Sequence, residues 1–396
     1  MEINSACPHA RVCGGCRYQG MDYTEQLVLK QGRAEELLGS FGPVLPILGA
    51  DEPLRYRNKV HAAFGYDRQR RLISGIYRPG SHEIVPVDDC LIENELADRI
   101  VAAIREMLPD FRIPAYDERR GSGWLRHVLV RCSRAAGQAM VVLVAVSPVF
   151  KNQNAFLGEL RRRFPEISTV VLNVNDRFGP VVLGQKNKTL YGSGCIEDVL
   201  CGLRFRISPS SFYQINSAQT EKLYAKAIDY AGLHGTETVL DAYCGVGTIG
   251  LCAASSAGRV VGVEINAGAV RDAIANARLN GVKNAWFSVG DAGEEMERMV
   301  REGFGPDVVL MDPPRSGSDR RFLDSLLRCA PARVVYVSCD PETLRRDLQV
   351  LTAGSYRAEK IRPVDMFPYT EHIETVCLLS KASEAKHHIK KTGVSV

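Results

Sequence analysis

Long hydrophobic runs are absent from the sequence. None approaches the roughly 20 residues that a membrane-spanning helix needs, which argues against a membrane protein. The first residues lack a basic segment followed by an apolar stretch, so no secretory signal is readable and a cytoplasmic protein is predicted. Internal repeats and low-complexity tracts are absent too. Basic and acidic residues nearly balance, with 50 against 46, and the net charge of +4 says little about partners.

Size and composition are those of an ordinary globular protein. At roughly 100–200 residues per domain, the length predicts two or three domains. Hydrophobic residues make up 45% and charged residues 24%, which argues against wholesale disorder and collagen. We expect residues 1–205 to form an N-terminal and central region, residues 206–383 a second domain, and residues 384–396 a polar tail.

The second half of the chain alternates short apolar runs with helical segments such as 269–280 and 341–351. Near-continuous apolar strands that alternate with helices are typical of a parallel sheet covered on both faces, so an α/β fold is predicted. The strands are expected at 238–243, 259–265, 307–311 and 333–338, with 374–380 as a further strand at the edge.

The first half predicts a separate sheet. Residues 127–133 and 139–146 have the pattern of two antiparallel strands, and residues 169–175 and 181–184 that of a second pair.

Two helices flank this sheet in the sequence. The first covers residues 24–38 and begins at Thr24 as its N-cap, and the second covers 217–231 and ends at Gly232. The residues at helical spacing in the first helix are Leu27, Lys30, Ala34, Leu37 and Leu38.

Basic residues concentrate in two stretches. Residues 55–78 hold seven lysines and arginines against the single acid Asp67, and residues 112–134 hold six arginines against Asp117 and Glu118. Such stretches are either solvated surface or a face that contacts phosphates, and the sequence leaves both readings open.

A glycine-rich turn follows the first strand of the second half. Gly245, Gly247 and Gly250 spell GxGxxG, and Glu264 follows 19 residues beyond Gly245 at the end of the next strand. Glycines let a backbone approach a ligand closely, and a carboxylate at this spacing can bind ribose hydroxyls. A nicotinamide dehydrogenase would have much the same pattern.

Two acidic residues favour a cofactor with a positive charge. Asp241 stands at the strand end before the glycines, where a pyrophosphate gains nothing from a carboxylate. Asp312 opens Asp-Pro-Pro-Arg (312–315) after a later strand, and this sequence is typical of S-adenosylmethionine-dependent methyltransferases. The other reading of Asp312 is a cap on the following helix.

The chain has twelve cysteines, which a cytoplasmic protein of this length does not need as disulfides. Metal binding or catalysis is the better reading. Cys7, Cys13, Cys16 and the distant Cys90 could hold zinc or an iron–sulfur cluster, because four cysteines suit either. Cys339 follows the fourth apolar run, at the carboxyl end of a predicted strand, where open α/β sheets bind ligands.

These segments together resemble one family. VLDAYCGVGTIGL, VVGVEIN, DPPR, VVYVSCDPETLRRDL and DMFPYTEHIETVCLL occur in the order seen in RNA uracil-5-methyltransferases, and FYQIN (212–216) resembles a cofactor-contacting segment of that family. The leading cysteines resemble the iron–sulfur branch that modifies 23S ribosomal RNA.

The resemblance spans nearly the whole chain. It implies a C-terminal Rossmann-like methyltransferase domain and an N-terminal and central α+β RNA-binding domain that carries a cysteine-ligated cluster. The RNA-binding TRAM barrel of some members is expected to be absent, because only six residues precede Cys7.

The resemblance also implies a reaction. Carbon 5 of uracil is a poor nucleophile until a thiolate adds to carbon 6, and cysteine suits that covalent step. By resemblance, Cys339 is the nucleophile and Glu374 the base that removes the proton from carbon 5. Alternation along a strand would place His372 and Glu374 on one face and Glu371 on the other. Because the target base must leave its stack, an unpaired or loop region of 23S rRNA is the expected partner.

The same resemblance assigns ligands. Glu264 suits the ribose diol, Tyr243 the sulfonium or adenine, and Asp291 the adenine amino group. The expected residues that bind S-adenosylmethionine are Gln214, Tyr243, Glu264, Asp291 and Asp312. The expected ligands of a structural 4Fe–4S cluster, with zinc as the alternative metal, are Cys7, Cys13, Cys16 and Cys90.

No membrane and no obligate protein partner is implied, and a monomer is the default expectation. Three alternative functions stay open: a tRNA uridine-5-methyltransferase, a nicotinamide dehydrogenase and a non-catalytic iron–sulfur RNA-binding protein.

Overall fold

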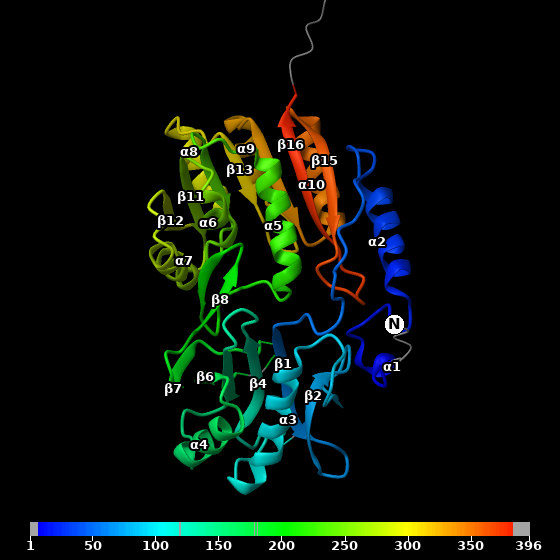
Figure 1. Ribbon diagram of the computed structural model, residues 1–396, viewed down its shortest axis with the longest axis vertical. Helices are drawn as coiled ribbons and strands as arrows, with labels where there is room; N and C mark the ends of the chain where they lie inside the picture. Colours follow the sequence, from blue (N-terminus) through cyan, green and yellow to red (C-terminus); the bar gives the residue numbers. More distant parts are fainter. Residues whose placement is uncertain (1–6, 119, 178, 180, 383–396) are drawn as a thin grey trace, which may run out of the picture.

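The computed structural model describes residues 7–118, 120–177, 179 and 181–382, so the polar tail expected at 384–396 lies outside the described residues. Two seven-stranded sheets form two lobes, one above the other in Figure 1. Within the described ranges, no helix is both long and apolar enough to cross a membrane.

The upper sheet is built by the second half of the chain in the order β12-β11-β10-β13-β14-β16-β15. β10 to β14 run parallel, β16 is antiparallel to β14, and β15 is antiparallel to β16. The parallel sheet predicted from the apolar runs is therefore confirmed. The strand bounds are β10 Thr238–Ala242, β11 Arg259–Glu264, β12 Ala285–Val289, β13 Val308–Met311, β14 Arg333–Ser338, β15 Tyr356–Val364 and β16 Glu374–Lys381.

The predicted edge position of β16 is wrong. β15 lies outside it and forms the edge of the sheet. The sequence of β15, YRAEKIRPV, mixes charged and apolar residues because one side of this strand faces solvent, and it therefore lacks a continuous apolar run.

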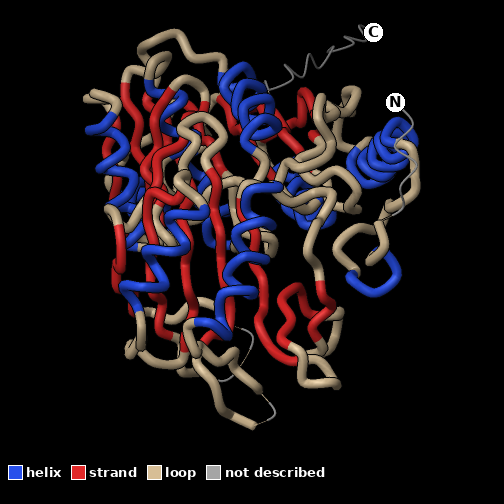
Figure 2. Tube along the Cα trace, turned by 60° about the horizontal axis from the view of Figure 1, so that its bottom comes forward, coloured by secondary structure: helices blue, strands red, loops and turns tan. Residues whose placement is uncertain are grey.

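Helices cover both faces of the upper sheet (Figure 2). Residues 217–231 are helical as predicted, and Gly232 ends that helix with a φ of 55°. One face is covered by α5 Ser217–Ala231, α6 Thr248–Ala254 and α7 Ala267–Leu279, and the other by α8 Ala292–Arg301, α9 Arg320–Cys329 and α10 Pro341–Ala353.

The lower sheet has the order β3-β2-β1-β4-β5-β6-β7, and α3 Glu95–Asp110 and α4 Gln153–Arg163 cover one of its faces. The antiparallel β4–β5 pair is confirmed, whereas β5 and β6 run parallel. The strand bounds are β1 Lys59–Tyr66, β2 Leu72–Tyr77, β3 Ile84–Pro86, β4 Leu125–Cys132, β5 Ala139–Ala145, β6 Ile167–Val174 and β7 Lys186–Tyr191.

The strand predicted at 181–184 is wrong, and β7 pairs with β6 instead. In the 181–184 segment, asparagine side chains form the hydrogen bonds to the backbone that a neighbouring strand would otherwise form. Asn175 Nδ2 donates to the carbonyls of Val181 and Val182, and Gly184 N donates to Asn173 Oδ1.

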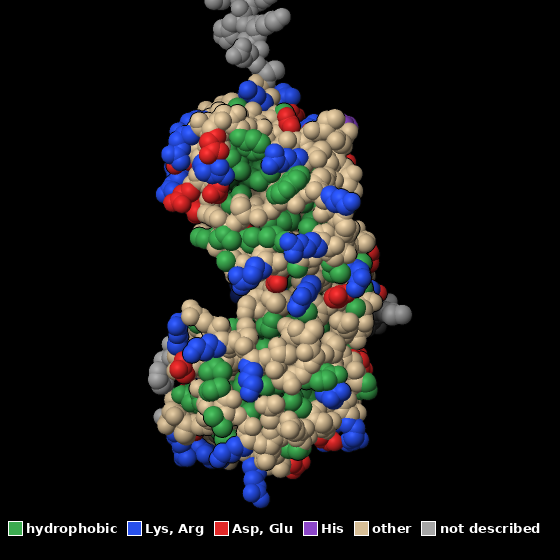
Figure 3. All heavy atoms as spheres, turned by 90° about the vertical axis from the view of Figure 1, so that its left-hand side faces the viewer, with side chains coloured by type: hydrophobic (Ala, Val, Ile, Leu, Met, Phe, Trp, Pro, Cys, Tyr) green, Lys and Arg blue, Asp and Glu red, His purple; other side chains and the backbone are tan. Residues whose placement is uncertain are grey.

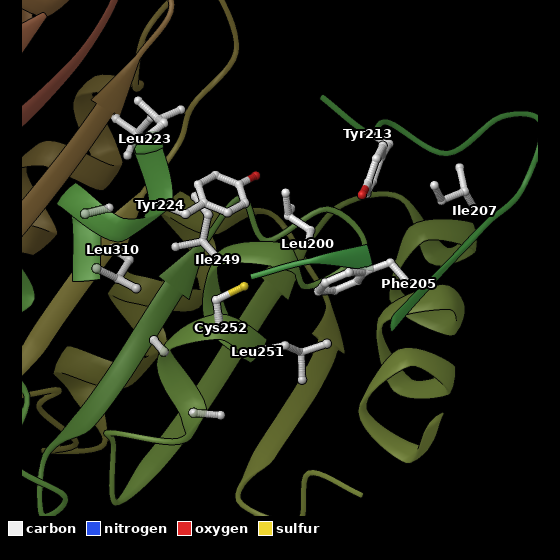
Figure 4. Packing of buried hydrophobic residues seen from close by; sticks show 14 of the residues in the cluster. Leu200, Phe205, Ile207, Tyr213, Leu223, Tyr224, Ile249, Leu251, Cys252 and Leu310 are labelled. Carbon is white, nitrogen blue, oxygen red and sulfur yellow. The ribbon is translucent and has the colours of Figure 1, made fainter. Parts of the chain in front are cut away.

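A short hairpin, β8 Ile196–Leu200 and β9 Leu203–Ile207, lies between the lobes in the sequence and packs on the upper one. Figure 4 shows Leu200 and Phe205 of this hairpin beside Leu251 and Cys252 of α6.

The N-terminal segment reaches both lobes, because its first helix lies beside β2 of the lower lobe and its second helix packs on the upper lobe. It contains α1 Ala10–Cys13 and α2 Tyr23–Leu38, and α2 lies beside α10 and β15 (Figure 1). The N-cap of α2 is Asp22, whose side chain accepts a hydrogen bond from Thr24 N. The observed cap therefore lies two residues before the predicted cap at Thr24. The buried face of α2 consists of Gln26, Lys30, Ala34 and Leu38.

Candidate functional site

Cys339 and Glu374 stand opposite each other at the carboxyl-terminal edge of the upper sheet. Ser338, the last residue of β14, pairs with Thr375 of the antiparallel β16. Cys339 directly follows Ser338, and Glu374 directly precedes Thr375, so the two residues are the next opposite pair. Cys339 is half-buried, and Glu374 is 2% exposed. The register therefore joins a thiol and a carboxylate that are 35 positions apart in the sequence.

Asp312, just after β13, belongs to the same group. Burial raises the pKa of Asp312 to about 7. Burial, and then the charge of Asp312, raise the pKa of Glu374 well above its ordinary value. The pKa of the Cys339 thiol rises to about 12 through burial and the nearby charges of Glu374 and Asp312. In the protein alone, the site thus favours the protonated thiol and the protonated Glu374.

Arg315 opposes these shifts. Its positive charge lowers the pKa of both Cys339 and Glu374. Arg315 Nη2 donates to Nδ1 of His372 at 2.8 Å, which fits a neutral imidazole, and the pKa of His372 is lowered by burial and by Arg315. Arg315 ends the Asp-Pro-Pro-Arg segment, yet sequence reasoning did not single it out as a functional residue.

The prediction of alternating faces for residues 371–374 is wrong, because β16 begins only at Glu374. Residues 371–373 are loop. Burial still separates the two glutamates, since Glu371 is exposed and Glu374 is buried.

The glycine turn is held by two carboxylates. Glu264 Oε2 accepts from Gly245 N at 3.2 Å, and its Oε1 accepts from Asn266 N at 2.7 Å. Asp241 Oδ2 accepts from Gly250 N at 2.9 Å. A Cβ at Gly250 would lie 2.6 Å from that same oxygen, so the close approach requires glycine.

Asp241 is 1% exposed and lies beneath the turn. Burial, followed by the charges of Asp312 and Glu264, raises the pKa of Asp241 to about 7, although the Gly250 hydrogen bond opposes this. A group of acids at one strand edge suits a cationic ligand and disfavours a pyrophosphate.

The other predicted cofactor residues lie around this edge. Tyr243 has a φ of 65°, its hydroxyl donates to Ser318 Oγ at 3.3 Å, and its ring contacts Phe322. Asp291 caps α8 by accepting from Glu294 N at 3.1 Å, and its charge raises the pKa of Tyr243. Asp291 and Tyr243 therefore lie near each other.

Gln214 is buried in the segment before α5. Its carbonyl accepts from Asn58 Nδ2 at 3.0 Å, so residues just before β1 fix this segment. No hydrogen bond among the described residues joins the side chain of Gln214 to Cys339, Glu374 or Asp312.

Part of the basic character of the first half is surface ion pairing, as in Arg70–Asp117 and Arg71–Asp67. Another part lies on one face of β1 and β4, where Lys59 stands directly opposite Arg131 in the strand register. Burial and the charges of Arg131 and Arg57 lower the pKa of Lys59 to about 8. Figure 3 shows the surface hollowed between the lobes, with lysine and arginine side chains near the hollow.

The four predicted metal ligands are free thiols, and none is fully buried. Burial raises the pKa of Cys13 and of Cys16; the charge of Cys7 adds to both shifts and that of Cys13 to the shift of Cys16, so these three thiols lie near one another. The pKa of Cys90 is raised to about 12 by burial and then by Glu93. Nowhere in the described ranges do three or more His, Cys, Asp or Glu side chains form a group that could hold a metal ion. The donor types fit a cubane cluster, but the structure does not bring the four together.

Comparisons with known proteins point to one family. The family model described as tRNA (Uracil-5-)-methyltransferase matches residues 196–382. An uncharacterized RNA methyltransferase of Halalkalibacterium halodurans is 42% identical over 382 residues, which cover 95% of this chain and 83% of that protein. One from Caldanaerobacter subterraneus subsp. tengcongensis is also 42% identical, over 383 residues that cover 96% and 84% of the two chains.

One solved structure is similar over most of its length. It is the Pyrococcus abyssi tRNA (uracil-54, C5)-methyltransferase in complex with S-adenosyl-L-homocysteine. The TM-score is 0.77 and the sequence identity 27%, and the match covers 92% of this chain and 85% of that one.

Proposed function

Because the chain belongs to the RNA uracil-5-methyltransferase family, we propose that it methylates carbon 5 of one uridine in an unpaired or loop region of 23S rRNA. S-adenosylmethionine supplies the methyl group when it is bound. The observation that carries the proposal is the position of Cys339 opposite Glu374, beside Asp312, at the edge of the sheet where such folds bind ligands.

Cys339 is proposed as the nucleophile. Its thiolate adds to carbon 6 of uracil, and the electrons of the carbon 5–carbon 6 double bond become available at carbon 5 for the methyl group. The raised pKa means that few thiolates exist in the protein alone. Arg315 lowers that pKa, so we assign it the role of stabilising the thiolate.

Glu374 is proposed as the base. After methyl transfer, carbon 5 still carries its proton, and the carboxylate removes it so that the thiolate can leave carbon 6. Burial of Glu374 suits this role, because a desolvated carboxylate with a raised pKa is a stronger base than a surface one.

Five residues are proposed to bind the cofactor: Gln214, Tyr243, Glu264, Asp291 and Asp312. Glu264 lies at the end of β11 beside the glycine turn, which supports a role at the ribose. The acids at this edge support a sulfonium cofactor over a nicotinamide dinucleotide.

The substrate RNA is proposed to bind in the hollow between the lobes. Lys59 and Arg131 lie on one sheet face. Burial and the charges of Arg131 and Arg57 lower the pKa of Lys59 to about 8, and burial lowers the pKa of Arg131 to about 10. A phosphate beside Lys59 would offset this repulsion, which supports the phosphate-contacting reading of this part of the basic stretch.

Methylation of tRNA is the second candidate, because the similar Pyrococcus abyssi structure is a tRNA (uracil-54, C5)-methyltransferase. The four-cysteine pattern favours rRNA, since it resembles the branch that modifies 23S rRNA.

We further propose that Cys7, Cys13, Cys16 and Cys90 hold a 4Fe–4S cluster that ties the N-terminus to the lower lobe. The support is the donor chemistry and the proximity of the first three thiols. Anaerobic purification followed by iron and zinc analysis tests this. Iron should be lost in Cys16→Ser and kept in the control Cys329→Ser. An iron-free, zinc-replete protein would overturn the assignment.

The decisive experiment is methyl transfer from labelled S-adenosylmethionine. The anaerobically purified protein is incubated with unmodified 23S rRNA or tRNA, and the labelled nucleoside is identified. Label in 5-methyluridine of rRNA is the expected result. Label only in tRNA would keep the reaction and replace the substrate, and the absence of 5-methyluridine from both RNAs would overturn the proposed activity.

A further inference from the structure

The loop that leads to Glu374 is bound along its backbone by distant parts of the chain. This loop, residues 365–373, joins β15 to β16. Five consecutive carbonyls at its start each accept a hydrogen bond from outside the loop. The bonds are Gln219 Nε2 to Asp365 O (2.9 Å), Asn216 Nδ2 to Met366 O (3.1 Å), Lys30 Nζ to Phe367 O (3.1 Å), Tyr56 Oη to Pro368 O (3.1 Å) and Tyr18 N to Tyr369 O (3.0 Å).

Lys30 is the centre of this arrangement. Its ammonium also pairs with Asp365 Oδ1 at 2.6 Å, and both side chains are 0% exposed. Tyr23 Oη donates to the other oxygen of Asp365 at 2.9 Å. A buried ion pair contributes little net stability compared with an apolar pair of similar volume. An apolar pair, however, offers no donor to the Phe367 carbonyl, so Lys30 specifies a backbone position.

Tyr369 shows why the loop needs this support. Its φ is 66°, a region that a residue with a bulky side chain adopts only when its surroundings impose it. Both of its backbone polar groups are bound by the N-terminal segment. Tyr369 N donates to Gln26 Oε1 at 2.9 Å, and Tyr369 O accepts from Tyr18 N. The strained conformation is therefore maintained by residues 18–30.

Glu374 depends on this loop for its position. Its Oε2 atom is buried and has no hydrogen-bond partner among the residues that the structure describes. Because no side chain orients that oxygen, the backbone that enters β16 sets where it points. Only the four residues 370–373 separate Tyr369 from Glu374, so the chain between them has little freedom to move.

We propose that Lys30 is a positioning residue for Glu374: it holds the 365–373 loop so that the carboxylate reaches the proton on carbon 5 of the methylated uracil. The inference rests on the proposed function. In the step concerned, the proton moves from carbon 5 to a Glu374 oxygen. The electrons of that C–H bond form the carbon 5–carbon 6 double bond, and the bond from carbon 6 to the Cys339 sulfur breaks to release the thiolate. A misplaced base therefore slows release of the RNA and leaves the earlier methyl transfer intact.

The test compares Lys30→Met with the control Arg33→Ala. Arg33 lies on the same helix but forms a solvent-exposed ion pair with Glu342. In Lys30→Met, single-turnover methyl incorporation into RNA should match wild type, whereas turnover should fall by roughly a hundredfold, the scale of a 1 Å displacement. The fraction of RNA covalently bound to protein, seen as a denaturation-resistant band, should rise. Arg33→Ala should behave as wild type.

A second variant covers a failure of Lys30→Met to fold. Tyr56→Phe removes only the donor to Pro368 O and should raise the trapped fraction in the same direction. A folded Lys30→Met, or failing that a folded Tyr56→Phe, with wild-type turnover and no excess adduct would overturn the proposal. A wild-type protein that forms no 5-methyluridine, or a Glu374→Gln variant that traps no RNA, would instead overturn the proposed function.

Discussion

Asp241 and Gly250 are hydrogen-bonded beneath the glycine turn: the Asp241 carboxylate accepts from the Gly250 amide at 2.9 Å and leaves no room for a side chain at position 250. The turn is thus built around a buried acid. Across the same edge, Cys339 and Glu374 stand opposite each other, and the charge of Asp312 acts on both Asp241 and Glu374, so these acids share one electrostatic environment.

Replacement of Cys339 by serine should abolish methylation and adduct formation. A serine hydroxyl is a far weaker nucleophile than a thiolate, so we expect a loss of at least about a thousandfold in kcat. The fold should persist, because Cys339 is only half-buried. S-adenosylhomocysteine should still raise the Tm of the variant, and NAD should not. Retained 5-methyluridine formation would contradict the assignment.

Replacement of Glu374 by glutamine should trap RNA on the protein. The amide cannot take the proton from carbon 5, so the covalent intermediate accumulates as a band that survives denaturation. Glu371→Gln is the matched control, because Glu371 is exposed and lies in the same segment. The control should turn over normally. A fully active Glu374→Gln would end the assignment of the base.

Activity should increase with pH. The pKa of Cys339 is raised to about 12 and that of Glu374 is also raised, so both required deprotonated forms become more populated as pH increases. We expect kcat/KM to climb from about pH 6 to 9 without a plateau. Arg315→Gln removes the charge that lowers both pKa values, so its profile should move to higher pH, with roughly a tenfold lower rate per pH unit of displacement. A flat profile for wild type would contradict this.

Stability should depend on pH through Asp241. Its pKa is raised from 3.8 to about 7 in the folded protein, so the stability it contributes is fully present below its unfolded pKa and is lost as pH rises through the folded value. Between about pH 4 and 7, Asp241→Asn should make Tm decline less steeply with pH than in wild type. The corresponding change in the free energy of unfolding is at most about 1.4 kcal/mol per pH unit. The exposed Asp324→Asn should leave the slope unchanged. An equal slope in both variants would contradict the prediction.

Sequence patterns predicted the upper sheet well because its strands are buried on both faces. The runs at β10, β11, β13 and β14 are predominantly apolar, and that signal does not depend on distant neighbours. β15 was missed for the opposite reason, since an edge strand with one solvated side alternates charged and apolar residues. The segment 181–184 looked like a strand because its apolar letters do not reveal that asparagine side chains bind its backbone.

The proposed reactive groups were named from the sequence, but the sequence could not show how they are arranged relative to one another. Cys339 was identified by its place after a strand and by the family resemblance, whereas its position opposite Glu374 depends on the β14–β16 register. Lys30 is a similar case. Helical spacing counted it on an apolar face beside Leu27 and Leu37, while the structure buries it against Asp365. A buried charge has no local signature, because its partner lies elsewhere in the chain.

The ion pair between Lys30 and Asp365 also determines when during synthesis α2 can dock. The two residues are 335 positions apart, and at 5–20 residues per second a ribosome needs roughly 20 to 70 seconds to synthesise the chain between them. Through that interval α2 has no acid partner and no β15 to cover, and a helix of 16 residues is only marginally stable alone in water. α2 is therefore secured only after β15 has been synthesised, and the edge of the upper sheet that holds Cys339 and Glu374 is completed in a late step of folding.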